Sequence, residues 1–199
     1  MNQFTPPPSG ATFSQRVRTS ARQLAELGED SISGLIDLTS LRLVRFATTL
    51  TRNQHDAEDA VQATLVKIAA QPKRLHQCTD PWAYLLRMVR NESMLIMRRR
   101  PRWNLIGDVC DLLTRCRVDE LEREESYREI WRAMRKLPTQ QSEVVVLKIW
   151  EEMTFAEIAG VLDISPSTAA SRYRYAIAKL NCQLRENLSQ PHEDLQQHV

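Results

Sequence analysis

Arginine is concentrated in one short stretch of this 199-residue chain, beside aromatic side chains. The stretch holds six arginines and a single acid, Glu92, although the whole chain has a formal net charge of only +2. Guanidinium groups bind phosphate oxygens and aromatic rings stack on unpaired bases, so the stretch predicts a nucleic-acid surface. The alternative is a solvated helix end, because cations are also favoured at helix C-termini. The arginines are Arg87, Arg90, Arg98, Arg99, Arg100 and Arg102, and the aromatic residues are Trp82, Tyr84 and Trp103.

A second set of candidate DNA-binding side chains lies between Thr154 and Leu180, where the pattern is that of two helices joined by a turn. Thr154 and Glu157 form a capping box for the first helix, and Ser165 with Pro166 begins the second. Such a second helix can enter the DNA major groove, although the same hairpin also occurs with its polar face in water. The polar face carries Ser167, Thr168, Ser171, Arg172, Arg174 and Lys179, and the apolar face carries Ala169, Tyr173, Ala176, Ile177 and Leu180.

Acidic side chains gather at the start of a third predicted helix, where Asp56, Glu58 and Asp59 lie close together. A helix dipole favours negative charge at this end, which is a sufficient explanation for them. The acids could equally form a docking face for a basic partner helix. The residues alone leave both explanations open.

Other kinds of site find little support in the chain. It has no nucleophile–base pair and no Gly-rich phosphate loop, so we expect no enzymatic activity and no cofactor. No apolar run is long enough for a membrane span and no signal sequence is recognisable, which predicts a cytoplasmic protein. A metal site is conceivable, but no cysteine pair has zinc-finger spacing, so we expect free thiols and no metal. The conceivable metal ligands are His76, Cys78, Cys110 and Cys116, and Cys182 is the remaining free thiol.

The elements that would position these side chains read as helices throughout, because glycine is scarce and strand-like alternation is nearly absent. We therefore expect an all-α protein with two small helical domains joined by a linker. The first domain is predicted at 30–102 and the second at 119–188, with 103–118 as the linker. An N-terminal extension, 1–29, is expected to be partly disordered with a short helix within Ser14–Leu27, and 189–199 is a tail.

Within the first domain, a helix is predicted with an apolar repeat, followed by a corner and a second helix capped by Asp56. A polar loop is expected between Gln71 and Asp80, where Asp80 caps the arginine-rich helix. In the second domain, Thr139 is predicted to cap the helix that leads into the two-helix stretch. The apolar repeat of the first helix is Leu35, Leu38, Leu41, Val44 and Leu50.

Taken together, these blocks resemble the extracytoplasmic-function (ECF) group of bacterial RNA polymerase sigma factors. HDAEDAVQATLVKIAA (55–70) resembles the polymerase-binding region 2.2, and YLLRMVRNESMLIMRRR (84–100) resembles regions 2.3 and 2.4. LPTQQSEVVVLKIWEEMTFAEIAGVLDISPSTAASRYRYAIAKL (137–180) resembles region 4. The resemblance spans about Leu35–Arg102 and Glu125–Leu184, with both blocks in the family's order.

The resemblance implies partners and site residues. Asp56, Glu58, Asp59 and Gln62 would bind the β′ clamp helices of core RNA polymerase, and the second domain would sit on the β flap. Promoter DNA would be held at the opened −10 element, with flipped bases near the loop 73–80, and at the −35 major groove. The resemblance leaves open whether an anti-sigma factor also binds the chain. The −10 residues implied are Arg87, Arg90, Asn91, Arg98, Arg99 and Arg100, and the −35 residues are Ser167, Thr168, Ser171, Arg172 and Arg174.

Departures from the family pattern affect the DNA contacts. Tyr84, Ser93 and Leu95 stand where the family usually has Trp, Ala and Asp. In the recognition helix, Ala170 replaces a family Lys and Tyr175 replaces a family Arg. Losing a phosphate contact lowers the salt dependence of binding, so the −35 preference cannot be copied from other members.

Two other classes of protein fit part of the pattern. A stand-alone helix-turn-helix regulator of duplex DNA needs only the second domain, and it leaves the acidic face and the arginine-rich helix unexplained. A helical adaptor without DNA binding would explain Ala170 and Tyr175. Gel filtration with core polymerase distinguishes the first class from a sigma factor, and a DNA-binding assay at low salt distinguishes the second.

Overall fold

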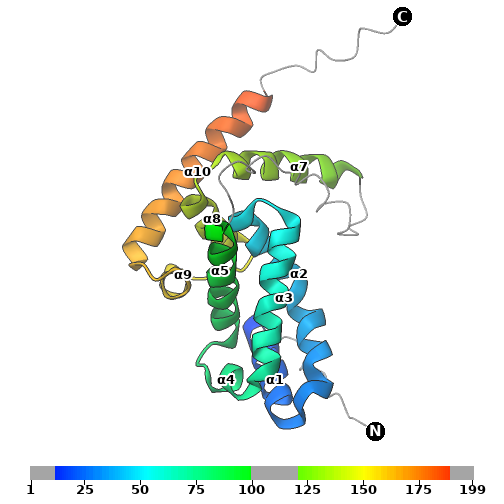
Figure 1. Cartoon of the computed structure of the whole chain (residues 1–199). Coiled ribbons are helices and arrows are strands. Elements are labelled where there is room, and N and C mark those ends of the chain that lie inside the picture. Colours follow the sequence, from blue (N-terminus) through cyan, green and yellow to red (C-terminus); the bar gives the residue numbers. More distant parts are fainter. Residues whose placement is uncertain (1–11, 100–120, 189–199) are drawn as a thin grey trace, which may run out of the picture. The chain divides into compact units, whose positions relative to one another are not determined.

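The computed structural model describes residues 12–99 and 121–188, except for the side chains of 29–30, 121–128 and 186–188 (Figure 1). Within these ranges the chain forms helices and turns and no strand, as the sequence predicts. The helices are α1 (Phe13–Leu27), α2 (Ile32–Thr51), α3 (Gln54–Ala70), α4 (Pro72–Gln77), α5 (Pro81–Arg99), α7 (Leu121–Lys136), α8 (Thr139–Ile149), α9 (Phe155–Leu162) and α10 (Pro166–Leu188), with a 3-10 turn at Gly28–Ser31. Helices α1 to α5 form an N-terminal unit, and α7, α8, α10 and the first part of α9 form a C-terminal unit.

The core of the N-terminal unit lies between α2, α3 and α5, which pack against one another. The buried face of α2 includes Leu35, Leu43, Phe46 and Leu50. Leu41, which the apolar repeat placed with them, is 62% exposed, so this part of the prediction is wrong. The α2 face that α3 and α5 cover runs through Leu43 and Phe46, and a helix with apolar residues on several sides does not reveal which side its neighbours cover.

Helix α1 is packed into the N-terminal unit through three fully buried side chains, Val17, Ala21 and Leu24. It contacts α4, α2 and α5, and it begins with a capping box between Thr12 and Gln15. The sequence predicted a short helix here, and the structure adds its packing partners.

Two further contacts join α1 to the start of α5. The guanidinium of Arg18 donates to the backbone carbonyl of Thr79. The rings of Phe13 and Trp82 meet edge to face with their centroids 4.8 Å apart, and the guanidinium carbon of Arg42 lies 3.9 Å from the centre of the Phe13 ring. Trp82 is only 1% exposed, so the start of α5 is shielded from solvent where these contacts form.

The turn before α3 differs from the prediction. Asn53, and not Asp56, caps this helix, because its side-chain oxygen accepts a hydrogen bond from the Asp56 amide at 3.1 Å. Arg52 takes the left-handed conformation that reverses the chain, with φ of 54°. Asp56 therefore lies inside the first turn of α3, where it is only 8% exposed.

Asn53→Ala is expected to lower the free energy of unfolding of the N-terminal unit by about 1 kcal/mol, because an orphan amide of α3 loses its acceptor. Asn53→Asp should retain most of that free energy, since a carboxylate also caps a helix. Hydrogen exchange at the backbone amides of α3 measures the change. Equal protection in wild type and Asn53→Ala would show that Asn53 does not stabilise this end.

Two other local predictions about helix boundaries meet different outcomes. The stretch expected to be a polar loop contains the short helix α4, which buries Leu75. Asp80 caps α5 as predicted, because its carboxylate accepts from the amides of Trp82 and Ala83 at 3.0 and 3.2 Å. A single apolar residue such as Leu75 gives no periodicity, which is why α4 escaped notice.

In the C-terminal unit, the core includes four consecutive residues of α8, Val144 to Leu147. Thr139 does not cap α8: it is the first helical residue, and Pro138 occupies the cap position without a side-chain hydrogen bond. The rings of Trp131 in α7 and Trp150 after α8 lie 5.4 Å apart. None of the helices that the structure describes is both long and apolar enough to cross a membrane.

Candidate nucleic-acid interface

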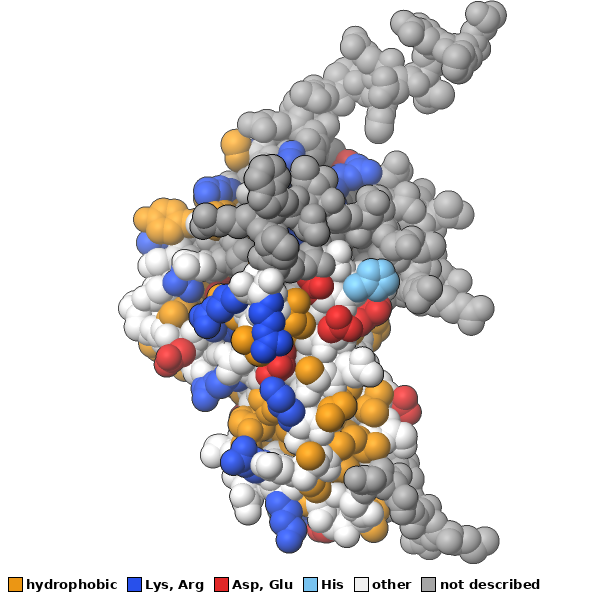
Figure 2. All heavy atoms as spheres, in the orientation of Figure 1, with side chains coloured by type: hydrophobic (Ala, Val, Ile, Leu, Met, Phe, Trp, Pro, Cys, Tyr) orange, Lys and Arg blue, Asp and Glu red, His pale blue; other side chains and the backbone are white. Residues whose placement is uncertain are grey.

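Helix α5 has a buried apolar side and an exposed side that carries most of its arginines, although Leu95 on the exposed side is 39% exposed. Its buried side includes Trp82, Leu85 and Val89. Its exposed side carries Arg87 and, one turn and three turns later, Asn91 and Arg98, so these three side chains follow one ridge. Figure 2 shows Lys and Arg side chains gathered over α5.

The remaining arginines predicted for this surface differ in their surroundings. Arg99 is exposed, whereas Arg90 is half-buried and engaged with a neighbour. Arg100 and Arg102 lie outside the described residues, as do Trp103 and the predicted linker. The ridge is therefore defined by Arg87, Asn91 and Arg98, with Arg99 beside its end.

The outer face of α3 carries the predicted docking residues. Glu58, Asp59 and Gln62 are exposed, and Gln54 donates to the Glu58 carboxylate at 2.7 Å. Asp56 is set apart from them by its burial. The acidic face is thus formed by three of the four predicted residues.

Apolar side chains continue the exposed face of α3 and were missed by the sequence analysis. Val66 is 62% exposed and follows Gln62 by one turn of the helix, and Leu41 on the neighbouring α2 is equally exposed. Figure 2 shows hydrophobic side chains gathered over α2 and α3, with Asp and Glu side chains closer to the start of α3. The signal in the sequence was an apolar residue on the polar side of the helix.

The predicted helix-turn-helix forms in the C-terminal unit through the expected local contacts. The Glu157 amide donates to the Thr154 hydroxyl at 3.3 Å, and the Thr154 amide donates to the Glu157 carboxylate at 2.7 Å, which completes the capping box. Ser165 caps α10 by accepting from the Thr168 amide at 3.0 Å. Asp163 turns the chain between α9 and α10 with φ of 57°.

An aromatic and cationic stack fixes the helix-turn-helix against α8. The rings of Phe155 in α9 and Tyr173 in α10 lie 5.8 Å apart, edge to face. The Lys148 ammonium of α8 lies 5.1 Å from the centre of the Phe155 ring and donates to the Met153 carbonyl at 3.0 Å. These contacts join α8, α9 and α10.

The polar face of α10 is only partly open. Ser167 and Arg174 are exposed, whereas Thr168 and Ser171 are half-buried. Tyr175 is 60% exposed beside Arg174, whose guanidinium carbon lies 5.7 Å from the centre of the Tyr175 ring. Tyr175 was predicted only as a replacement of a family Arg, and it follows Ser171 on the same face by one helical turn.

Arg172 faces the interior of the C-terminal unit more than solvent. Its Nη1 atom lies 3.8 Å from Oε1 of Glu143 on α8, and the side chains of Arg172 and Glu143 are 23% and 2% exposed. A buried carboxylate needs a cation or hydrogen bonds nearby. Arg172 therefore lies where its charge can compensate that of the buried Glu143 carboxylate on α8.

The cysteines do not assemble with other ligands in the part of the chain that is described. No group of three His, Cys, Asp or Glu side chains suited to a metal occurs within 12–99 and 121–188, and Cys110 and Cys116 lie outside these ranges. The Cys78 thiol donates to the Arg74 carbonyl at 3.1 Å. Burial raises the pKa of Cys78, against the opposing effect of Arg87, so the thiol stays protonated at neutral pH.

Comparison with known proteins identifies the family of the chain. A family model described as Sigma-70 region 2 matches residues 35–102, and one described as Sigma-70, region 4 matches residues 127–180. The ECF RNA polymerase sigma factor SigL of Mycobacterium tuberculosis is 28% identical over 155 residues, which cover 76% of this chain and 88% of that protein.

Solved structures show the same architecture. CnrH, solved in complex with the cytosolic domain of CnrY, has a TM-score of 0.59 and 25% identity over 86% of this chain and 99% of that one. The sigma factor RpoE of Bartonella quintana, solved with the anti-sigma factor NepR, has a TM-score of 0.62 and 24% identity over 75% of this chain and 94% of that one. With both characteristic regions matched in order, the chain belongs to the ECF group of the sigma-70 family of RNA polymerase sigma factors.

Proposed function

We propose that this chain binds core RNA polymerase and directs it to promoters, where it reads the −35 element and opens the −10 element. The observation that carries the proposal is the pairing of two surfaces in one unit. The outer face of α3 is acidic and apolar, and the ridge of α5 is basic. A stand-alone regulator of duplex DNA would not need this unit. The Sigma-70 region 2 model matches the unit at residues 35–102.

Docking on the β′ clamp helices is assigned to Glu58, Asp59 and Gln62, whose exposure supports the assignment. Asp56, named with them in the sequence analysis, is 8% exposed and lies in the first turn of α3, where the helix dipole favours a carboxylate. The C-terminal unit sits on the β flap.

Contact with the opened −10 element is assigned to the ridge of Arg87, Asn91 and Arg98, together with Arg99. Guanidinium groups along one helix face can follow the phosphates of a single strand. Arg90 contributes from a half-buried position, and Arg100 is assigned from the sequence alone. Flipped bases are received near the segment 73–80, which contains α4 and the turn after it.

Reading of the −35 element is assigned to the start and the open face of α10. Ser167 and Arg174 are exposed and can reach base edges or phosphates in a major groove. Thr168 and Ser171 lie at the margin of this face. Arg172 contributes indirectly, by pairing with Glu143 on α8 behind this face.

The chain contributes recognition and not a reaction of its own, because catalysis belongs to the polymerase that it joins in the cytoplasm. CnrH and RpoE were each solved with a second protein, CnrY or NepR, and NepR is an anti-sigma factor. We propose that an anti-sigma factor also binds this chain and covers the exposed faces that polymerase needs.

The proposal is tested by gel filtration with purified core polymerase and by run-off transcription from a genomic promoter library. Co-elution and discrete start sites are expected. A chain that stays apart from core polymerase but shifts duplex DNA would instead be a stand-alone regulator. A chain that does neither would be an adaptor without DNA binding.

Replacing both Arg98 and Arg99 with Ala should impair promoter opening more than polymerase binding. Removing two phosphate contacts lowers affinity for the opened strand and reduces its salt dependence by up to about two units on a logarithmic scale. Permanganate reactivity of −10 thymines measures opening, and co-elution measures polymerase binding. The double replacement of Arg16 and Arg22 on α1 removes the same charge and should leave opening unchanged. Undiminished reactivity in the Arg98 and Arg99 variant would reject the −10 assignment.

A further inference from the structure

Glu92 is an exception on the basic helix α5, because it is the only acid between Pro81 and Arg99. It follows Asn91, a member of the ridge proposed to bind the opened −10 strand. A carboxylate at this place would repel phosphates and offset part of the attraction that the arginines provide.

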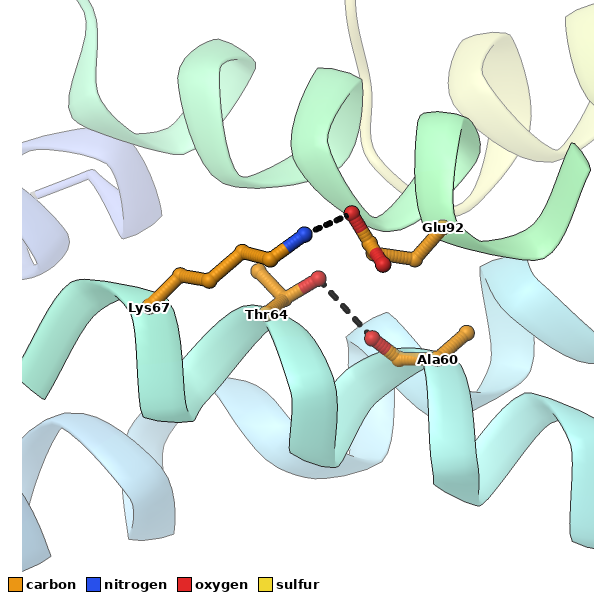
Figure 3. A network of polar contacts seen from close by, with 4 residues as sticks. All are labelled: Ala60, Thr64, Lys67 and Glu92. Carbon is orange, nitrogen blue, oxygen red and sulfur yellow. Dashed lines mark hydrogen bonds and ion pairs between the residues drawn. The ribbon is translucent and has the colours of Figure 1, made fainter. Parts of the chain in front are cut away.

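The structure pairs Glu92 with a cation from another helix. Nζ of Lys67 on α3 lies 2.5 Å from Oε1 of Glu92 (Figure 3). The Glu92 side chain is 16% exposed and that of Lys67 is 54% exposed, so the carboxylate is largely covered while the ammonium still meets solvent. Water screens a half-buried pair less than a fully exposed one.

The surroundings on α3 keep Lys67 on the side that faces α5. One turn before it, Thr64 is fully buried between the helices and donates to the Ala60 carbonyl at 2.8 Å (Figure 3). Lys67 therefore projects from the edge of the α3–α5 contact, where its ammonium meets the Glu92 carboxylate.

We infer that Lys67 masks the charge of Glu92 and thereby keeps this carboxylate from opposing the attraction of Arg87, Arg98 and Arg99 for promoter DNA. Lys67 is a positioning residue, since it acts on DNA only through Glu92. The inference rests on the proposed function, and within it Lys67 tunes the −10 interaction from the helix that binds polymerase.

The competing explanation is that the ion pair only stabilises the packing of α3 against α5, as a tie between the two helices. The two explanations differ for Glu92→Gln. A tie predicts that Glu92→Gln and Lys67→Met do similar harm, because either breaks the same bond. Masking predicts that Lys67→Met does harm by uncovering the carboxylate, whereas Glu92→Gln removes the repulsion and does none.

The experiment compares wild type, Lys67→Met, Glu92→Gln and the double variant, each as the full chain bound to core polymerase. The readouts are affinity for a forked promoter DNA with a single-stranded −10 element, permanganate opening, and affinity for core polymerase. Lys67→Met is expected to weaken forked-DNA binding by about two- to fivefold at low salt, and this deficit should shrink as KCl rises. Glu92→Gln should match or exceed wild type, and the double variant should return to the wild-type value.

Arg22→Met is the matched control. Arg22 pairs with Glu26 on α1 at 3.0 Å, so this change also removes one cation and uncovers one carboxylate, but away from α5. It should leave forked-DNA binding unchanged.

The inference is overturned if the double variant stays as weak as Lys67→Met, or if Glu92→Gln is itself weakened. Unaltered DNA binding by Lys67→Met, with an active wild-type protein, overturns it as well. A wild-type protein that opens no promoter overturns the proposed function and this inference together.

Discussion

Asp59→Arg is expected to abolish association with core RNA polymerase while leaving the helices intact. Asp59 is exposed on the outer face of α3, so the reversed charge is tolerated in the free protein. Opposite a basic partner helix, the new guanidinium produces a like-charge contact that costs several kcal/mol, which corresponds to more than about a 100-fold loss of affinity.

Fluorescence anisotropy with labelled protein and core polymerase measures this loss, and circular dichroism checks the helices. Glu26→Arg provides the control, because it reverses an exposed acid on α1 and should bind normally. Asp56 is unsuitable for the same test, since a reversed charge at a residue that is 8% exposed would disturb folding. Co-elution of Asp59→Arg at wild-type strength would refute the docking assignment.

Arg172→Ala is expected to weaken both the C-terminal unit and −35 recognition. The change takes away the guanidinium beside Glu143, whose side chain is 2% exposed. Removing one partner of a fully buried ion pair costs about 3–5 kcal/mol. Because Arg172 retains some solvent contact, we expect about 1–3 kcal/mol here, measured as a loss of thermal stability in that unit.

Arg174→Ala separates anchoring from reading. Arg174 is exposed one turn from Ala170 and Ser171, so its removal should weaken −35 binding without changing thermal stability. Adding Glu143→Gln to Arg172→Ala should recover much of the lost stability, since the remaining side chain is neutral. If Arg172→Ala leaves stability intact and costs about 1–3 kcal/mol of base discrimination, then Arg172 reads a base edge directly.

The features that the sequence predicted best are those stabilised within a few residues. The capping box of Thr154 and Glu157, the Ser165 cap and the Asp80 cap all form as their spacing indicates. Each depends on a side chain reaching an amide two or three residues away, so no distant part of the chain needs to be known.

Two local caps, those of α3 and α8, were assigned to the wrong residue, and the other features that escaped prediction depend on which neighbour covers a helix face. Leu41 had the right spacing for a core position, yet the packing of α2 leaves it exposed. Asp56 and Arg172 were both read as accessible side chains, yet Asp56 is only 8% exposed and Arg172 lies toward Glu143 of a neighbouring helix. Polarity alone does not distinguish a solvated charge from one paired across two helices.

The packing of α1 bears on how the chain tolerates proteolysis. Val17, Ala21 and Leu24 are fully buried, and burial of one such large side chain as Val or Leu contributes about 1.5–3 kcal/mol. A protease that cut at the turn Gly28–Ser31 would thus not release a dispensable leader peptide. Cleavage there is expected to destabilise the N-terminal unit, because the helix that covers α4, α2 and α5 would no longer be tethered to the rest of the chain.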